Sequence, residues 1–146
     1  MKKNSVKRIL SIAVMFAILL SSFSFVANAE DISPRFNNVN TISSISSISD
    51  SGKLTVTNRF SSSPSVFTKA VITTYVEKRT LGIFWSRVDI GQTNDEWVDT
   101  VYENVYSGMH SHQLEKTGTY RITVEYVIYG TGGAADVVTR EMQKTY

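Results

Sequence analysis

Apolar and polar residues alternate along the last third of the chain. Between residues 120 and 128 every second position is apolar, while Arg121, Thr123 and Glu125 fall between them. A period of two places one face in a core and the other in water. The glycine-rich segment GTGGAA (130–135) supplies the positive φ that a reversal needs, and a Val/Thr-rich run follows from Asp136. This stretch therefore predicts an antiparallel β-hairpin.

Similar runs occupy most of the preceding sequence. Turn residues separate β-rich segments at 54–60, 66–78, 83–90 and 97–106, and another segment enters the hairpin after Gly108. No segment shows helical periodicity. We expect seven or eight strands in an all-β, antiparallel sandwich, with a small barrel as the other architecture that this pattern allows.

The first β-rich candidate, TISSISSISD (41–50), spaces Ile42, Ile45 and Ile48 three residues apart, which matches neither a strand nor a helix period. It is either a serine-rich linker or a bulged edge strand with Ile42 and Ile48 facing inward and Ile45 outward. The cost of leaving three isoleucines in water favours the edge strand.

The spacing of Leu114, Gly118, Tyr120 and Ile122 resembles the corner that enters strand F of immunoglobulin-like domains. In that family the tyrosine hydroxyl bonds the backbone a few residues upstream. Ile122 stands where the family has its second cysteine, and residues 66–78 lack the family's tryptophan. The resemblance therefore implies an immunoglobulin-like sandwich in the loose sense and not an antibody-type domain.

Residues 1–29 have the three parts of a secretory signal peptide. Four basic residues precede an apolar run of twelve residues, and the segment ends in Ala27-Asn28-Ala29. An uncleaved anchor is the alternative, but the run is too short to cross a bilayer about 30 Å thick. We expect a flexible lead-in at 30–40, one domain at 41–146, and a secreted chain that is either free or loosely held at the cell envelope.

Cleavage would change the charge. It removes four basic residues and no acidic one, which leaves 11 Lys plus Arg against 13 Asp plus Glu, a formal charge of −2. A nucleic-acid partner would call for a clustered basic face, so none is expected. The chain has no cysteine, which excludes disulfides, a thiol nucleophile and a lipid anchor on cysteine.

The mature sequence also resembles a group of small exported proteins of Gram-positive bacteria that have no assigned function. The resemblance rests on ISPRF, the Ile/Ser-rich stretch, EKRTLGIFW, GTYRITVEY and YGTGGAADV. It spans nearly the whole mature chain and implies location and fold. It implies no catalytic residue.

Candidate chemistry is sparse. His110 and His112 would lie on one strand face, which makes them a weak metal candidate, although a solvated strand face explains them more simply. The glycine-rich segment lacks the Lys-Ser/Thr of a phosphate loop, and no serine lies in a Gly-x-Ser-x-Gly motif. We expect no cofactor and no enzymatic activity.

Aromatic residues are the better candidates for a binding surface. Large apolar groups at a strand-connecting turn suggest a contact site, unless Phe84 and Trp85 fold back to close one end of the sandwich. The interpretation that follows is a non-catalytic binding or adhesion module for a surface glycan or protein. A secreted effector acting on envelopes and an extracellular enzyme remain alternatives. The candidate contact residues are Leu81, Phe84, Trp85, Trp97, Tyr102 and Tyr106.

We predict that the released protein begins at Glu30 and is found in the culture medium, because the segment before it has the composition that signal peptidase recognises. N-terminal sequencing of secreted material checks this. An intact Met1 in a membrane fraction would contradict it.

Overall fold

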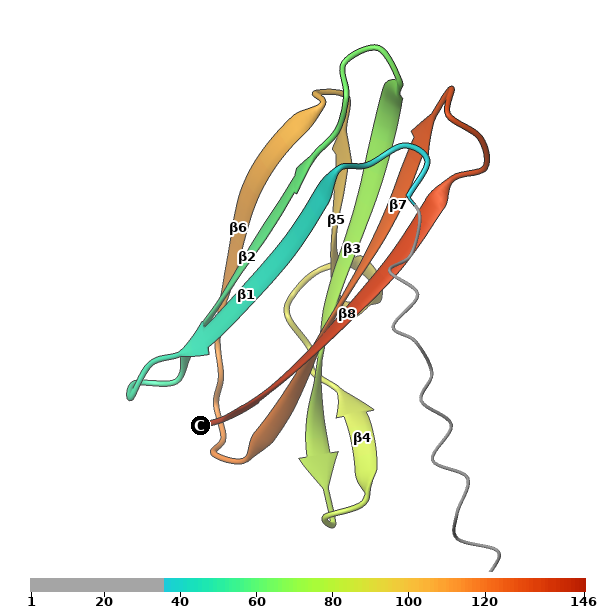
Figure 1. The fold of residues 1–146 in the computed structure, drawn as a ribbon. Coiled ribbons are helices and arrows are strands. Elements are labelled where there is room, and N and C mark those ends of the chain that lie inside the picture. Colours follow the sequence, from blue (N-terminus) through green and yellow to red (C-terminus); the bar gives the residue numbers. More distant parts are fainter. Residues whose placement is uncertain (1–35) are drawn as a thin grey trace, which may run out of the picture. The chain divides into compact units, whose positions relative to one another are not determined.

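The computed structural model describes residues 36–146, which form eight strands (Figure 1). No α-helix occurs in that range, and the 3₁₀ turn η1 (Thr93–Asp95) precedes β5. The strands are β1 (Thr41–Ile48), β2 (Lys53–Ser61), β3 (Phe67–Thr80), β4 (Phe84–Arg87), β5 (Glu96–Val101), β6 (Val105–Gln113), β7 (Thr119–Gly130) and β8 (Asp136–Thr145).

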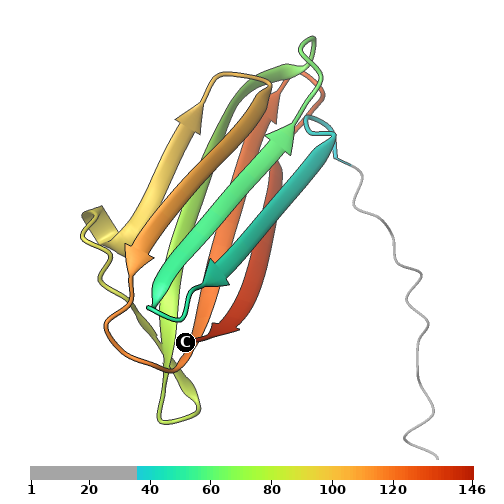
Figure 2. The same ribbon diagram turned by 90° about the vertical axis from the view of Figure 1, so that its left-hand side faces the viewer.

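The strands form two antiparallel sheets that face each other (Figure 2). One sheet has the order β1-β2-β6. The other has the order β4-β3-β7-β8, and β5 also pairs with β3. Immunoglobulin-like domains place the strands lettered A, B and E in one sheet and C, F and G in the other. Here β1, β2 and β6 are separated from β3, β7 and β8 in the same way. The prediction of an all-β immunoglobulin-like sandwich is confirmed.

The core lies between β2 on one side and the β3–β7 pair on the other. Even-numbered residues of β3 from Ala70 to Val76 and of β7 from Tyr120 to Ile128 are buried, as the alternation predicts. Register pairs such as Ile72 with Tyr126 bring these rows side by side. Because the chain has no cysteine, the two sheets are held together by this packing and by hydrogen bonds between them.

Residues 41–48 form an edge strand as expected, but the expected bulge is wrong, because simple alternation already places Ile42 and Ile48 on one face and Ile45 on the other. β1 pairs with β2 in unbroken register, Ile42 and Ile48 pack against the core, and Ile45 faces outward. The turn after it closes with Gly52 at φ 81°, where its N–H donates to the Ser49 carbonyl at 2.9 Å. Glycine supplies this left-handed backbone conformation at little cost.

Two predicted strand boundaries are wrong. The run 97–106 is not one strand, because residues 102–104 turn the chain from β5 in one sheet to β6 in the other. Nothing in Tyr102-Glu103-Asn104 carries a strong turn signal. The run 83–90 is a strand only at Phe84–Arg87, where it pairs with the end of β3.

The second half of the predicted flexible lead-in packs against the domain. Asn38 and Val39 are buried, and the Asp136 carboxylate accepts three backbone N–H groups, from Asn37 at 2.9 Å, Asn38 at 2.7 Å and Val39 at 3.1 Å. A buried carboxylate needs such donors. The packed domain therefore begins before Thr41. The predicted signal peptide and residues 30–35 of the lead-in lie outside the described residues.

The glycine-rich segment 130–135 is shaped by the same contact. Gly132 N–H donates to Asn38 Oδ1 at 3.1 Å, and the Asn38 amide donates to the Ala134 carbonyl at 2.7 Å. A Cβ on Gly132 would lie 2.2 Å from the Asn37 carbonyl oxygen. Close backbone approach accounts for this glycine without a phosphate ligand.

The corner before β7 contains the contact that its motif predicts. Tyr120 is buried, and its hydroxyl donates to the Lys116 carbonyl. Leu114 and Ile122 are buried in the same core. Gly118, at φ 145°, exchanges two backbone hydrogen bonds with Tyr146, both at 3.0 Å. The corner thus joins the start of β7 to the C-terminal residue.

We predict that Tyr120→Phe lowers the free energy of unfolding by about 1 kcal/mol, because it removes one hydrogen bond and leaves the Lys116 carbonyl with one partner fewer. Urea unfolding measures the difference. Tyr129→Phe, at an exposed position of the same strand, is the matched control and should leave the midpoint unchanged. Equal midpoints for both variants would show that the corner contributes nothing.

Candidate functional site

The β3–β4 hairpin carries the most exposed apolar group at one end of the sandwich. Leu81, Ile83 and Phe84, called here the apolar tip, are 84%, 70% and 59% exposed. The reversal has positive φ at Leu81 (52°) and Gly82 (74°). The alternative that Phe84 folds back into the sandwich is therefore not what the structure shows, and its ring is available for contact.

Trp85 is half-buried, but it lies outside the core cluster. Two guanidinium groups lie over its ring, Arg121 at 4.6 Å and Arg79 at 5.9 Å from the centroid. Arg121 in turn forms an ion pair with Glu77 at 2.7 Å, and the hydrogen bond to Glu77 raises the pKa of Arg121. Cation–π contacts of this kind hold the hairpin against the outer face of the sheet. Trp85 therefore positions the apolar tip.

Cations flank the apolar tip. The segment 78–87 contains Lys78, Arg79 and Arg87 and no acidic residue. The Arg87 guanidinium lies 3.6 Å from the centroid of Tyr75. Among residues 36–146 none of these three cations forms an ion pair with a carboxylate. The hairpin thus presents apolar surface with positive charge at its base.

A cleft of about 550 Å³ lies where the base of this hairpin faces the tyrosine corner. Its walls include charged side chains of both signs. No sequence pattern singled them out as a group, because they come from β3, β4, the β4–β5 connection, β6 and the corner. The volume is in the range of small-ligand pockets. The walls that bear polar groups include Lys78, Arg87, Asp89, His112, Glu115 and Lys116.

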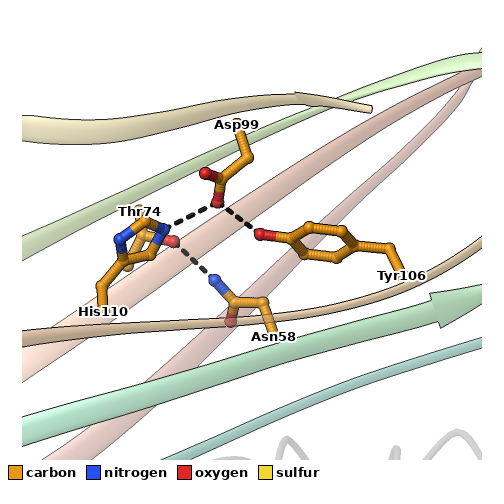
Figure 3. Close-up of polar contacts among 5 residues, drawn as sticks. All are labelled: Asn58, Thr74, Asp99, Tyr106 and His110. Carbon is orange, nitrogen blue, oxygen red and sulfur yellow. Dashed lines mark hydrogen bonds and ion pairs between the residues drawn. The ribbon is translucent and has the colours of Figure 1, made fainter. Parts of the chain in front are cut away.

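Trp97 and Tyr106 belong to a different group, at the edge where β5 of one sheet faces β6 of the other. Figure 3 shows Tyr106 of this group with Asp99 and His110. Asp99 Oδ2 accepts the Tyr106 hydroxyl at 2.7 Å and lies 2.7 Å from His110 Nε2. The Trp97 ring stacks on His110 with centroids 5.1 Å apart. We call Trp97, Asp99, Tyr106 and His110 the edge clasp. It links the two sheets where, within residues 36–146, neither β5 nor β6 pairs with another strand on that side.

Local sequence explains how Tyr106 reaches Asp99. The Tyr106 ring lies across its own strand, over Gly108, where a Cβ would be 1.7 Å from the tyrosine oxygen. Burial first, and then the hydrogen bond to Asp99, raises the pKa of Tyr106 above its ordinary value. The phenol thus remains a protonated donor to the carboxylate. Deeper in the core, Asn58 Nδ2 donates to Thr74 Oγ1 at 2.8 Å as a second tie between the sheets (Figure 3).

The structure divides the sequence-based candidates into three places. Leu81, Phe84 and Trp85 form the hairpin end, Trp97 and Tyr106 lie in the edge clasp, and Tyr102 is exposed in the β5–β6 turn. Sequence spacing did not reveal Asp99 as the residue that joins Tyr106 to His110. Within residues 36–146 no group of three His, Asp or Glu side chains is placed to hold a metal, so His110 and His112 have no third ligand there.

No protein-family model matches the chain, and no curated protein is similar to it. In the described part of the chain, no helix has the length and apolar character that a membrane span requires.

We predict that the edge clasp stabilises the fold. Asp99→Ala should cost about 1–3 kcal/mol, because it leaves two partly buried groups without their acceptor, and Tyr106→Phe should cost about 1 kcal/mol. Urea unfolding of both single variants and the double variant gives the coupling energy. The double variant should cost less than the sum of the singles, and strict additivity would show that the contact is not formed in solution.

Proposed function

We propose that this chain is an exported, non-catalytic binding module that attaches to a surface ligand through the β3–β4 hairpin. A surface glycan or protein is the class of ligand that the aromatic pattern favours. The bacterial origin and the secreted location belong to the same proposal, and they rest on the resemblance and on the export signal in the sequence.

The exposure of the apolar tip is the observation that carries the proposal. Soluble monomers seldom expose adjacent large apolar side chains without a use for them. Leu81, Ile83 and Phe84 are neighbours at a hairpin end, and the structure provides no intramolecular partner for them among residues 36–146. Binding at a loop on a rigid β scaffold needs no catalytic group.

A second candidate function, an effector that acts on envelopes, is supported by the charge of the same hairpin. Apolar side chains with cations beside them suit the interface of an anionic lipid surface. Lys78, Arg79 and Arg87 supply that charge. A leakage assay on vesicles containing phosphatidylglycerol separates the two functions, because a binding module leaves the vesicles intact and an effector releases their contents.

The binding test compares a tip variant, Ile83→Ser with Phe84→Ser, against a control variant, Met109→Ser with Val137→Ser. The control residues are also exposed, at 69% and 63%, and lie away from the hairpin. Retention of each protein is measured on cell envelopes, on polysaccharide extracted from them and on their surface proteins. If the tip residues are hot spots, the tip variant should be retained about tenfold less, or less still. The control variant should bind like the wild type.

The free energy of unfolding of both variants should lie within about 0.5 kcal/mol of the wild-type value, since all four positions are exposed. This separates a loss of binding from a loss of folding. If the tip variant is retained as well as the control, the hairpin is not the contact surface and the proposal fails.

A further inference from the structure

The sequence of β1 reads the same in both directions around Ile45. Residues 42–48 are ISSISSI, so Ile42 mirrors Ile48, and Ser43 mirrors Ser47. Two copies of such a strand can pair antiparallel about a two-fold axis at Ile45. Every cross-strand pair is then Ile with Ile or Ser with Ser, and the surface is self-complementary, as a two-fold interface requires.

The outer edge of β1 is free and uncharged. β1 ends the order β1-β2-β6, and no strand among residues 36–146 pairs with its other side. Natural edge strands are usually protected by charged side chains, prolines or bulges. β1 has no charged residue and no proline, and its register with β2 contains no bulge.

Along that edge, the residues that direct their backbone N–H and C=O groups outward are the ones that a two-fold pairing about Ile45 requires. Ser49 N–H donates to the Lys53 carbonyl, and on the other side of β2 Gly52 accepts from Leu114. Because hydrogen-bonding direction alternates along a strand, odd-numbered residues of β1 bond to β2 and even-numbered residues point to the free edge. In a pairing centred on Ile45, Ser44 lies opposite Ser46 of the second copy, so even-numbered residues meet even-numbered residues.

One buried group at this edge lacks a partner. Ser46 is 5% exposed, and its Oγ has no hydrogen bond within the described residues. Such a group is costly unless something else satisfies it. In the pairing described, Ser46 lies directly across from Ser44 of the second copy, and a change of the Ser46 χ1 rotamer would turn its hydroxyl, which its own chain covers in the monomer, toward that residue.

Ser44 has the acceptor capacity for this contact. The Tyr126 hydroxyl gives its single proton to the Ser43 carbonyl at 3.0 Å. In the 2.7 Å contact between Ser44 Oγ and Tyr126 Oη, Ser44 must therefore be the donor. The oxygen of Ser44 is left free to accept from Ser46 of the second copy.

We propose that the chain forms a symmetric dimer in which β1 pairs antiparallel with β1 of a second copy, centred on Ile45. The two three-stranded sheets then join into one continuous sheet. The occupant of the free edge is a second copy and not an unrelated peptide. The palindromic sequence, the outward backbone groups of the even-numbered residues and the unpaired Ser46 hydroxyl all fit pairing with β1 itself.

Single cysteines test the register, since the natural chain has none. The Cα atoms of Ile45 and its copy would be about 4.5 Å apart, within the range of a disulfide. Ser43 and its copy would be about 14 Å apart, because four residues at about 3.4 Å each separate them along the strands. Under oxidised glutathione, Ile45→Cys should cross-link to itself. Ser43→Cys and Ser47→Cys should not do so alone, but should cross-link when mixed. All three positions are exposed.

Analytical ultracentrifugation measures the dimer directly. It uses the protein as the producing cells secrete it, at increasing concentration. Ile45→Lys places two like charges opposite each other and should weaken the dimer roughly tenfold or more. Met109→Lys, at an equally exposed position on β6, should leave it unchanged. A wild-type chain that stays monomeric, equal cross-linking at all three cysteines, or a dimer indifferent to Ile45→Lys would each overturn the proposal.

Discussion

The pairing of β3 with β7 is the constraint on which the rest of this structure depends. It joins Phe67–Thr80 to Thr119–Gly130 and provides most of one wall of the core. With no cysteine in the chain, no covalent link replaces it. β3 continues past the residues that pack in the core. Its last residues, Glu77 to Thr80, also pair with β4, so the strand that builds the core also holds the exposed hairpin away from it.

The two ends of the β3–β7 pair are fixed by polar contacts of different kinds. At one end the Tyr120 hydroxyl holds the corner, and at the other the Asp136 carboxylate gathers the backbone of residues 37–39. The open side between β5 and β6 is closed by Asp99 with Tyr106 and His110. These bonds are few, but each occupies a place where packing alone leaves strand ends or edges unsecured.

The local sequence pattern predicted the buried strand faces and the tyrosine corner. Alternation identified the buried rows of β3 and β7, and the spacing around Tyr120 identified the corner, because both reflect which face of one strand is buried. The isoleucines of β1 were placed on the correct faces for the same reason.

The contacts that the sequence did not predict depend on which strands become neighbours. Trp97 and Tyr106 read as parts of one aromatic strand, yet the turn at residues 102–104 puts them in opposite sheets. Their common partner, Asp99, becomes visible only when those sheets face each other. The role of Asn38 in shaping the glycine-rich segment was hidden in the same way, since 94 residues separate it from Gly132. Contacts between distant segments are set by topology, which periodicity does not encode.

The direction of the strands gives the proposed dimer a consequence for how it would act. The β3–β4 hairpin lies at one end of the sandwich, and residues 36–40 lie at the other (Figures 1 and 2). Antiparallel pairing through β1 reverses one copy against the other, so the two apolar tips point in opposite directions. Such a particle gains no avidity on a single flat surface. The proposed dimer would instead bridge two surfaces that carry the same ligand, and it would agglutinate particles that display that ligand.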